Sequence, residues 1–281
     1  MIRADLHIHT YYSDGKHSPA EVAKMARENG VDLISVSDHD TMEGLEEKRA
    51  AAEKEGLLFV SGWEISAYQG DVKVHTLGYG CERKGAYHVF ASTLKKNALL
   101  RAEDCVSKAN AFLGSDVTMD DVLRECEGKD IPPHVMHVTR AFARKLNADI
   151  DEIFWKCFAW GKPAYSCIGR PTPEEAIDVI HACGGIAVLA HPGRIFMSET
   201  DRKKLMDRLV SHGLDGIECI YSQHTASETE YFSAYASAHG LLKTGGSDFH
   251  ARGFSRTVGN PLFYPDDELR AALKLRPSGD K

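Results

Sequence analysis

Residues 5–10 read Asp5-Leu6-His7-Ile8-His9-Thr10, a short strand-like run with two histidines two positions apart. Side chains alternate between the faces of a strand, so His7 and His9 point to the same side and can bind one ion. Further short apolar runs follow along the chain, each ending in a polar cluster and preceding a helical pattern. This alternation is typical of parallel β/α units, in which helices surround a sheet or barrel.

Helix start and stop signals separate the predicted strands. Ser18-Pro19-Ala20-Glu21 supplies an N-cap serine, an early proline and a capping-box glutamate, and Gly30 supplies the stop, which predicts a helix over 19–29. Thr172 and Thr225 begin the same pattern, and weaker signals predict helices near 44–55, 200–212 and 266–274. The predicted strands are 4–6, 33–36, 57–60, 72–77, 186–190, 216–220 and 241–244.

The middle of the chain shows no convincing strand. From about residue 86 to 162 the pattern is helical and charged, with a Gly/Lys/Asp/Pro break at 128–133. We therefore expect two domains: a metal-binding barrel made of 1–85 and 163–281, and an inserted helical cap made of 86–162.

Composition narrows the class of protein. The chain has 281 residues with 34 Lys and Arg against 41 Asp and Glu, a net charge of −7 that provides no general attraction to polyanions. No run approaches the ~18 apolar residues of a membrane helix, and the first residues lack a secretory signal, so we expect a cytoplasmic protein. The seven cysteines are scattered without a Cys-x-x-Cys pair, which argues against disulfides and thiolate zinc sites.

Metal-ligand residue types occur at or near the end of nearly every predicted strand. In parallel barrels the carboxyl ends of the strands carry the active site. A single such histidine is more often structural, but burying this many ionisable groups together would cost too much without cations between them. The candidate metal ligands are His7, His9, Asp14, His39, Glu64, His75, His191, Asp248 and His250.

Nine candidate ligands are too many for one tetrahedral ion, so two or three divalent metals are expected. Imidazole and carboxylate donors suit zinc, manganese or iron and do not choose among them. Glu64 is the only glutamate in these clusters and is the natural bridging ligand. A polynuclear centre of this kind activates water and clamps an in-line displacement, which predicts hydrolysis.

The same motifs resemble those of the polymerase and histidinol phosphatase (PHP) family of metal-dependent phosphoesterases. The similarity rests on Asp5–Thr10 with Ser13-Asp14-Gly15, Asp38–Thr41, Glu64, His75, His191-Pro192-Gly193 and Ser247–His250. It implies a distorted seven-stranded β/α barrel with an inserted cap. It also implies three metal subsites, made of His7, His9, Glu64 and Asp248; of Glu64, His75 and His191; and of Asp14, His39 and His250.

The chain is similar to the PHP branch with a helical insertion. That branch includes nucleotide 3′,5′-bisphosphate phosphatases, a 5′–3′ exoribonuclease on short RNA and a cyclic-phosphate dihydrolase. Relatives that act on nucleotides have Arg-x-His-Phe-Ala-Arg in the insertion, whereas this chain has Arg140-Ala141-Phe142-Ala143-Arg144. This departure weakens the transfer of a nucleotide or RNA substrate.

A phosphate ester needs cationic partners around the metals, and guanidinium matches phosphate best. Arg194, three residues after His191, is the strongest candidate, followed by Lys162 and Arg140 in the segment that could fold over the site. His224 could bind phosphate or protonate the leaving oxygen, with a solvated loop histidine as the alternative. Glu64 and Asp248 complete the expected catalytic residues.

We expect a phosphoesterase that hydrolyses phosphate mono- or cyclic diesters of small metabolites or nucleotides through a metal-bridging hydroxide. The alternatives are a 5′–3′ exonuclease on short oligonucleotides, a metal hydrolase of C–N bonds and a non-catalytic metal-binding module. The expected partners are a small phosphorylated substrate, a nucleotide or a short RNA end, with no membrane and no required protein partner.

Overall fold

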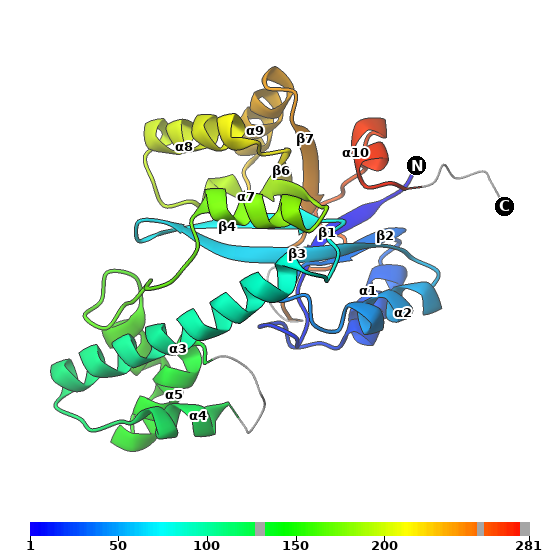
Figure 1. Ribbon diagram of the computed structural model, residues 1–281. Helices are drawn as coiled ribbons and strands as arrows, with labels where there is room; N and C mark the ends of the chain where they lie inside the picture. The colour runs from blue at the N-terminus through cyan, green and yellow to red at the C-terminus, as the bar shows by residue number, and fades with distance from the viewer. Residues whose placement is uncertain (127–132, 252–255, 276–281) are drawn as a thin grey trace. The chain divides into compact units, whose positions relative to one another are not determined.

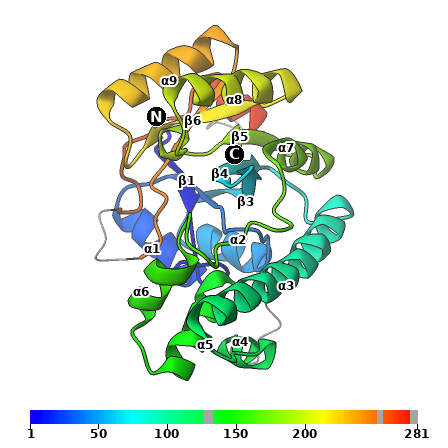
Figure 2. The same ribbon diagram turned by 90° about the vertical axis from the view of Figure 1, so that its left-hand side faces the viewer.

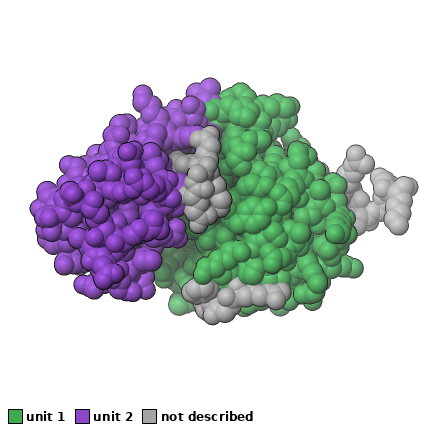
Figure 3. Space-filling model, turned by 90° about the horizontal axis from the view of Figure 1, so that it is seen from below, with its two compact units in different colours: residues 1–88, 171–281 green, residues 89–170 purple. Residues whose placement is uncertain are grey.

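The computed structural model describes residues 1–126, 133–251 and 256–275. These divide into two compact units, coloured separately in Figure 3: unit 1 comprises Met1–His88 and Pro171–Lys281, and unit 2 comprises Val89–Arg170. The break predicted at 128–133 falls almost wholly on 127–132, outside the described residues. That unit 2 serves as a cap stays a prediction.

Unit 1 contains a seven-stranded, nearly closed mixed barrel, which confirms the predicted fold class (Figures 1 and 2). The strands follow one another in chain order. The end of β1 meets the segment that follows β7 through hydrogen bonds from Asp248 N to His7 O (2.7 Å) and from His9 N to Phe249 O (2.9 Å). The strands are β1 Ala4–Ile8, β2 Leu33–Val36, β3 Leu58–Gln69, β4 Val72–Tyr79, β5 Ile186–Leu189, β6 Gly216–Tyr221 and β7 Leu242–Gly246.

Strand β4 departs from the parallel pairing that is typical of β/α units. This strand pairs antiparallel with both β3 and β5, while the other neighbouring pairs are parallel. The cause is a tight turn: only Gly70 and Asp71 separate β3 from β4, whereas a parallel crossover needs a dozen residues or more. Gly70 has a φ of 62°, in the left-handed region that such turns require.

Strand β3 continues well beyond its predicted end at residue 60. Gly62, two residues past that predicted end, lies inside the strand. A Cβ at this position would lie 2.2 Å from Ser35 Oγ, so glycine is required for β3 to approach β2 closely. The extension carries Glu64 into the middle of the strand.

Six α-helices accompany the barrel in the described residues of unit 1, and their bounds agree with the sequence signals to within a few residues. The capping boxes predicted at Ser18, Thr172 and Thr225 are all present. Helices α8 and α9 lie together on one side of the barrel, and α1 and α2 lie together on the opposite side (Figures 1 and 2). The helices are α1 Pro19–Glu28, α2 Leu45–Lys54, α7 Pro173–Ala182, α8 Glu199–His212, α9 Ala226–Ala238 and α10 Asp267–Ala272.

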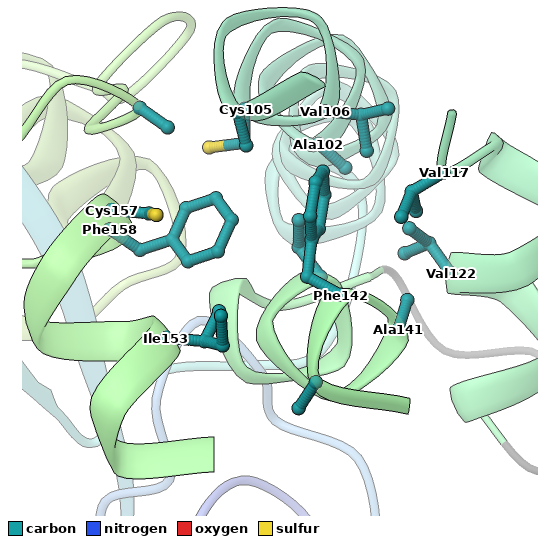
Figure 4. Packing of buried hydrophobic residues seen from close by; sticks show 14 residues of the cluster. Ala102, Cys105, Val106, Val117, Val122, Ala141, Phe142, Ile153, Cys157 and Phe158 are labelled. Atoms are coloured by element: carbon teal, nitrogen blue, oxygen red, sulfur yellow. The ribbon is translucent and has the colours of Figure 1, made fainter. Parts of the chain in front are cut away.

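Unit 2 is helical throughout its described regular structure and has its own core (Figure 4). Phe142 lies among the buried residues of this core (Figure 4), with its ring centroid 5.6 Å from that of Phe158 in an edge-on arrangement. The helices are α3 Ala86–Leu113, which begins in unit 1, α4 Met119–Glu125, α5 Val135–Leu146, α6 Ile150–Ile153 and the π-helical turn η1 Phe154–Phe158. Among the described residues, no helix has the length and apolar character needed to span a membrane.

Candidate metal centre

All nine predicted ligands lie in unit 1 and cluster within the barrel. His7 lies in β1 and His9 directly follows it, while the remaining ligands come from β3, β4 and the segments after β1, β2, β5 and β7. Glu64 lies inside β3 and not, as the sequence had predicted, at the end of its strand, whereas His75 lies inside β4, within the strand predicted over 72–77. The antiparallel hairpin explains this, because His75 pairs with Ser66 and therefore shares a sheet face with Glu64.

The first group consists of His7, His9, Glu64 and Asp248, whose ligand atoms all lie within 4.8 Å of one another. Glu64 Oε2 is 3.2 Å from both His7 Nε2 and His9 Nε2. Asp248 Oδ1 is 3.1 Å from His9 Nε2. All four residues are buried, so the group is a compact set of two imidazoles and two carboxylates.

The second group brings Asp14, His39 and His250 together and adds His9. Asp14 Oδ1 is 3.3 Å from His250 Nε2, and Asp14 Oδ2 is 3.8 Å from His39 Nε2. His9 Nδ1 lies 3.8 Å from Asp14 Oδ1, while its other nitrogen faces the first group. His9 therefore stands between the two groups, a position that sequence spacing did not indicate.

The third group is centred on the carboxylate of Glu64. Its Oε1 lies 2.8 Å from His75 Nδ1 and 3.1 Å from His191 Nε2, which brings together the expected trio. His39 belongs here as well, because its Nδ1 lies 3.0 Å from Glu64 Oε2. Together with His7 and His9, five imidazoles surround one carboxylate. Glu64 is thus placed to bridge cations.

The buried polar atoms of the cluster fit a multinuclear metal site. Within the described part of the chain, they have no hydrogen-bond partner of acceptable geometry, a costly arrangement in a barrel core unless cations bind them. Nitrogen and carboxylate oxygen donors suit zinc, manganese and iron alike, so the identity of the metal stays open. These atoms are His7 Nε2, both ring nitrogens of His9, His39 Nδ1, Glu64 Oε2, His75 Nε2 and His191 Nδ1.

The pKa values of the metal-free cluster reflect competition between burial and pairing. Burial acts to lower the pKa of His9, but the carboxylates of Asp248 and Glu64 outweigh it and raise that pKa to about 10. Burial prevails at His75 and lowers its pKa to about 3. Burial acts to raise the pKa of Asp14, yet His250 and His39 hold it well below its usual range. Because metals bind unprotonated ligands, metal binding must displace the proton of His9.

Sequence reasoning missed the supporting role of Glu218. This fully buried carboxylate in β6 places Oε1 2.9 Å from His7 Nδ1, and its Oε2 accepts the backbone N–H of His191 at 2.7 Å. A carboxylate on the far nitrogen of a histidine orients the ring and fixes its tautomer. The available signal was a charged residue inside the apolar run Gly216-Ile217-Glu218-Cys219-Ile220.

A second buried pair supports the segment that carries Asp14. Asp38 accepts hydrogen bonds from the Thr10 backbone N–H, the Thr10 hydroxyl and the Ser13 hydroxyl, each at 2.7 Å. Lys48 Nζ, from α2, lies 2.6 Å from Asp38 Oδ2, and its side chain is 1% exposed. The pair anchors the loop between β1 and α1, and sequence reasoning had given Lys48 no role.

The predicted phosphate ligands lie in different units. Arg194 is exposed at the end of the short 3₁₀ turn Pro192–Arg194, which directly follows His191. Arg140 in α5 and Lys162 are exposed on unit 2. Their contact with a substrate stays a prediction.

His224 uses both ring nitrogens in backbone contacts. Its Nε2 accepts the N–H of Gly193 at 3.2 Å, and its Nδ1 donates to the carbonyl of Cys219 at 3.1 Å. Burial lowers its pKa. Proton donation to a leaving group would first require one of these hydrogen bonds to break.

Known proteins resemble the chain over most of its length. The PHP domain model matches residues 5–128. The 3′,5′-nucleoside bisphosphate phosphatase of Chromobacterium violaceum is 32% identical over 285 residues, covering 99% of this chain and all of that protein. The phosphoribosyl 1,2-cyclic phosphate 1,2-diphosphodiesterase of Eggerthella lenta is 31% identical and covers 88% of this chain and 94% of that protein.

Two further matches extend this set. The 5′-3′ exoribonuclease Rnm of Escherichia coli is 30% identical, covering 88% of this chain and 84% of that protein. The solved structure of an amidohydrolase from Chromobacterium violaceum, with bound sulfate and no metal, aligns with a TM-score of 0.78 at 31% identity and covers 96% of both chains.

Proposed function

The chain belongs to the PHP domain family of metal-dependent phosphoesterases, and we propose that it hydrolyses phosphate mono- or cyclic diesters of small phosphorylated metabolites or nucleotides. The observation that carries this proposal is the Glu64 carboxylate, surrounded by five imidazoles in the barrel. A barrel with a purely structural role would not gather so many buried nitrogen and oxygen atoms that lack a hydrogen-bond partner among the described residues.

The nine candidate ligands would hold two or three divalent cations, and Glu64 belongs to more than one of the ligand groups. Such cations would activate a water molecule and neutralise charge on the phosphoryl group. The chain's own residues then have distinct tasks. Glu218 orients His7 and the backbone of His191, and the exposed guanidinium of Arg194 would bind a phosphate oxygen.

Nucleoside 3′,5′-bisphosphates are the first substrates to test, because the relative that matches the whole chain carries that activity in its name. Cyclic phosphodiesters are the second class, on the strength of the cyclic-phosphate relative. The alternative is a 5′–3′ exonuclease, which is supported by the similarity to the exoribonuclease Rnm. The net charge of −7 counts against it, because proteins that bind long RNA usually have a positively charged groove.

The test is phosphate release by protein reconstituted with Mn²⁺ or Zn²⁺, with the metal content measured in parallel. The panel contains sugar phosphates, nucleoside bisphosphates, cyclic phosphates and short 5′-phosphorylated RNA. We expect release from small esters, a Michaelis constant insensitive to salt and no progressive shortening of RNA. Cleavage of the RNA alone would favour the exonuclease, and inert protein holding two or more metals would favour the binding module or C–N hydrolysis.

Glu64→Gln tests whether the cluster performs the chemistry. We expect the variant to fold and to lose more than ~100-fold in turnover. Removing a residue that only orients a metal ligand costs ~10- to 100-fold, and Glu64 is expected to be a ligand itself. The matched control is Glu230→Gln, on the exposed surface of α9, which should retain parental activity. Near-parental turnover by metal-loaded Glu64→Gln would refute the assignment.

A further inference from the structure

The two carboxylate oxygens of Asp248 face different neighbours. Oδ1 faces the metal cluster, 3.1 Å from His9 Nε2 and 3.6 Å from His7 Nε2. Oδ2 faces away from these imidazoles, accepting the Tyr221 hydroxyl at 2.9 Å and lying 2.6 Å from Arg256 Nη1. Only one oxygen of this carboxylate is therefore free for a cation.

Arg256 also holds the backbone of Asp248. Its Nη1 donates to the Asp248 carbonyl at 2.9 Å, and its Nη2 donates to the Tyr221 hydroxyl at 3.0 Å. Asp248 has a φ of 52°, a left-handed conformation that persists only where the surroundings enforce it. The guanidinium thus binds both the side chain and the main chain of Asp248. The Tyr221 hydroxyl contacts both Asp248 and Arg256.

We propose that Arg256 is a positioning residue that fixes Asp248 as a one-oxygen metal ligand. The proposal rests on the proposed function, since it takes Asp248 as a ligand. A planar guanidinium can bind the carboxylate, the carbonyl and the phenol at once, whereas a lysine ammonium is a point charge on a flexible stem. Geometry, and not charge alone, is what Arg256 contributes.

Positioning and simple electrostatics predict opposite results. A cation beside a metal site repels the metal, so removing Arg256 would strengthen metal binding if its charge were the dominant effect. If its geometry dominates, Asp248 turns away from the site when Arg256 is removed, and metal binding weakens. Metal affinity therefore distinguishes the two roles without any assay of turnover.

The experiment is a calorimetric titration of the metal-free full chain with Mn²⁺, with bound metal per chain measured separately. We expect Arg256→Met and Arg256→Lys each to lower the affinity of one site by about 10- to 100-fold, as loss of a ligand's orienting partner does. Tyr221→Phe should act in the same direction with a smaller effect. Arg270→Met is the control, because among the residues that the structure describes the ion pair of Arg270 is with its neighbour Asp267 on α10.

Asp248→Asn separates this proposal from the proposed function. Unchanged Mn²⁺ binding by Asp248→Asn would refute the assignment of the ligand itself. If Asp248→Asn loses a metal, then unchanged or tighter binding by Arg256→Met, or parental binding by Arg256→Lys, would overturn the positioning role. Parental metal affinity with a raised Michaelis constant would overturn it too, because Arg256 would then contact substrate. Should Arg256→Met not fold, Arg256→Lys and Tyr221→Phe decide the question.

Discussion

Glu218 Oε1 lies 2.9 Å from His7 Nδ1 in the barrel core, so β6 holds the ring of a candidate metal ligand on β1. The second oxygen of Glu218 accepts the backbone N–H of His191 at 2.7 Å. His191 has a φ of 29°, in the left-handed region. One buried carboxylate thereby contacts two candidate metal ligands that are far apart in the sequence.

Glu218→Gln should lower metal affinity or activity by about 10- to 100-fold, because the amide cannot accept from both His7 and His191. Metal content and kcat measured on the same preparation will check this. The fold should survive, as judged by circular dichroism. A variant within twofold of the parent in both quantities would contradict the orienting role.

Lys48→Met should destabilise the protein by about 3–5 kcal/mol, because it leaves Asp38 as a buried charge without its cation. Urea denaturation will measure the difference. The matched control is Lys24→Met, which breaks an exposed i,i+4 pair with Glu28 and should cost no more than about 1 kcal/mol. An equal loss of unfolding free energy in the two variants would show that the buried Lys48–Asp38 pair stabilises the fold no more than the exposed pair does.

Gly246→Ala should impair both stability and metal binding. A Cβ on Gly246 would lie 2.4 Å from His7 Cβ and 2.6 Å from His7 N, so β7 or His7 must move, at a cost of about 1–3 kcal/mol. Gly240→Ala is the comparison: its φ of 64° imposes a strain of about 1–2 kcal/mol, but nothing lies within 4 Å of the added Cβ. Only Gly246→Ala should lose bound metal, and full metal content in this variant would contradict the prediction.

Native protein should show one rapidly reacting thiol and, after denaturation, seven. Cys167 is partly exposed, whereas the other six cysteines are buried. Burial raises the pKa of Cys81 and of Cys219 to about 12, which leaves almost no reactive thiolate at pH 8. Titration with a chromogenic disulfide will count the thiols, and Cys167→Ser should abolish the fast phase. A fast phase that survives this substitution would place another thiol at the surface.

Local patterns allowed much of the barrel to be predicted from the sequence. A capping box such as that at Ser18 is made between residues three positions apart, so it is visible in the sequence and recurs in the structure. The alternation of a strand likewise determines that His7 and His9 share a face. Ligand types, and hence a hydrolytic metal centre, follow from such short-range information.

The direction of β4 needed more than strand periodicity. An apolar run is compatible with parallel and antiparallel pairing alike, and only the two-residue turn at Gly70 and Asp71 sets the choice. Gly62 illustrates the same difficulty, since a glycine can end a strand or allow close approach inside it.

The sequence by itself determined which side chains could bind metal, because ligand chemistry belongs to the residue type and its local spacing. Only the tertiary structure decided which of them meet and which residues hold them in place. It places His9 in two of the groups, Glu218 against the ring of His7, and Arg256 against the carboxylate of Asp248. The physical reason is closure of the barrel. It brings β1 beside β7 and thereby places in contact residues such as Asp5 and Ser247, 242 positions apart, whose pairing no local periodicity encodes.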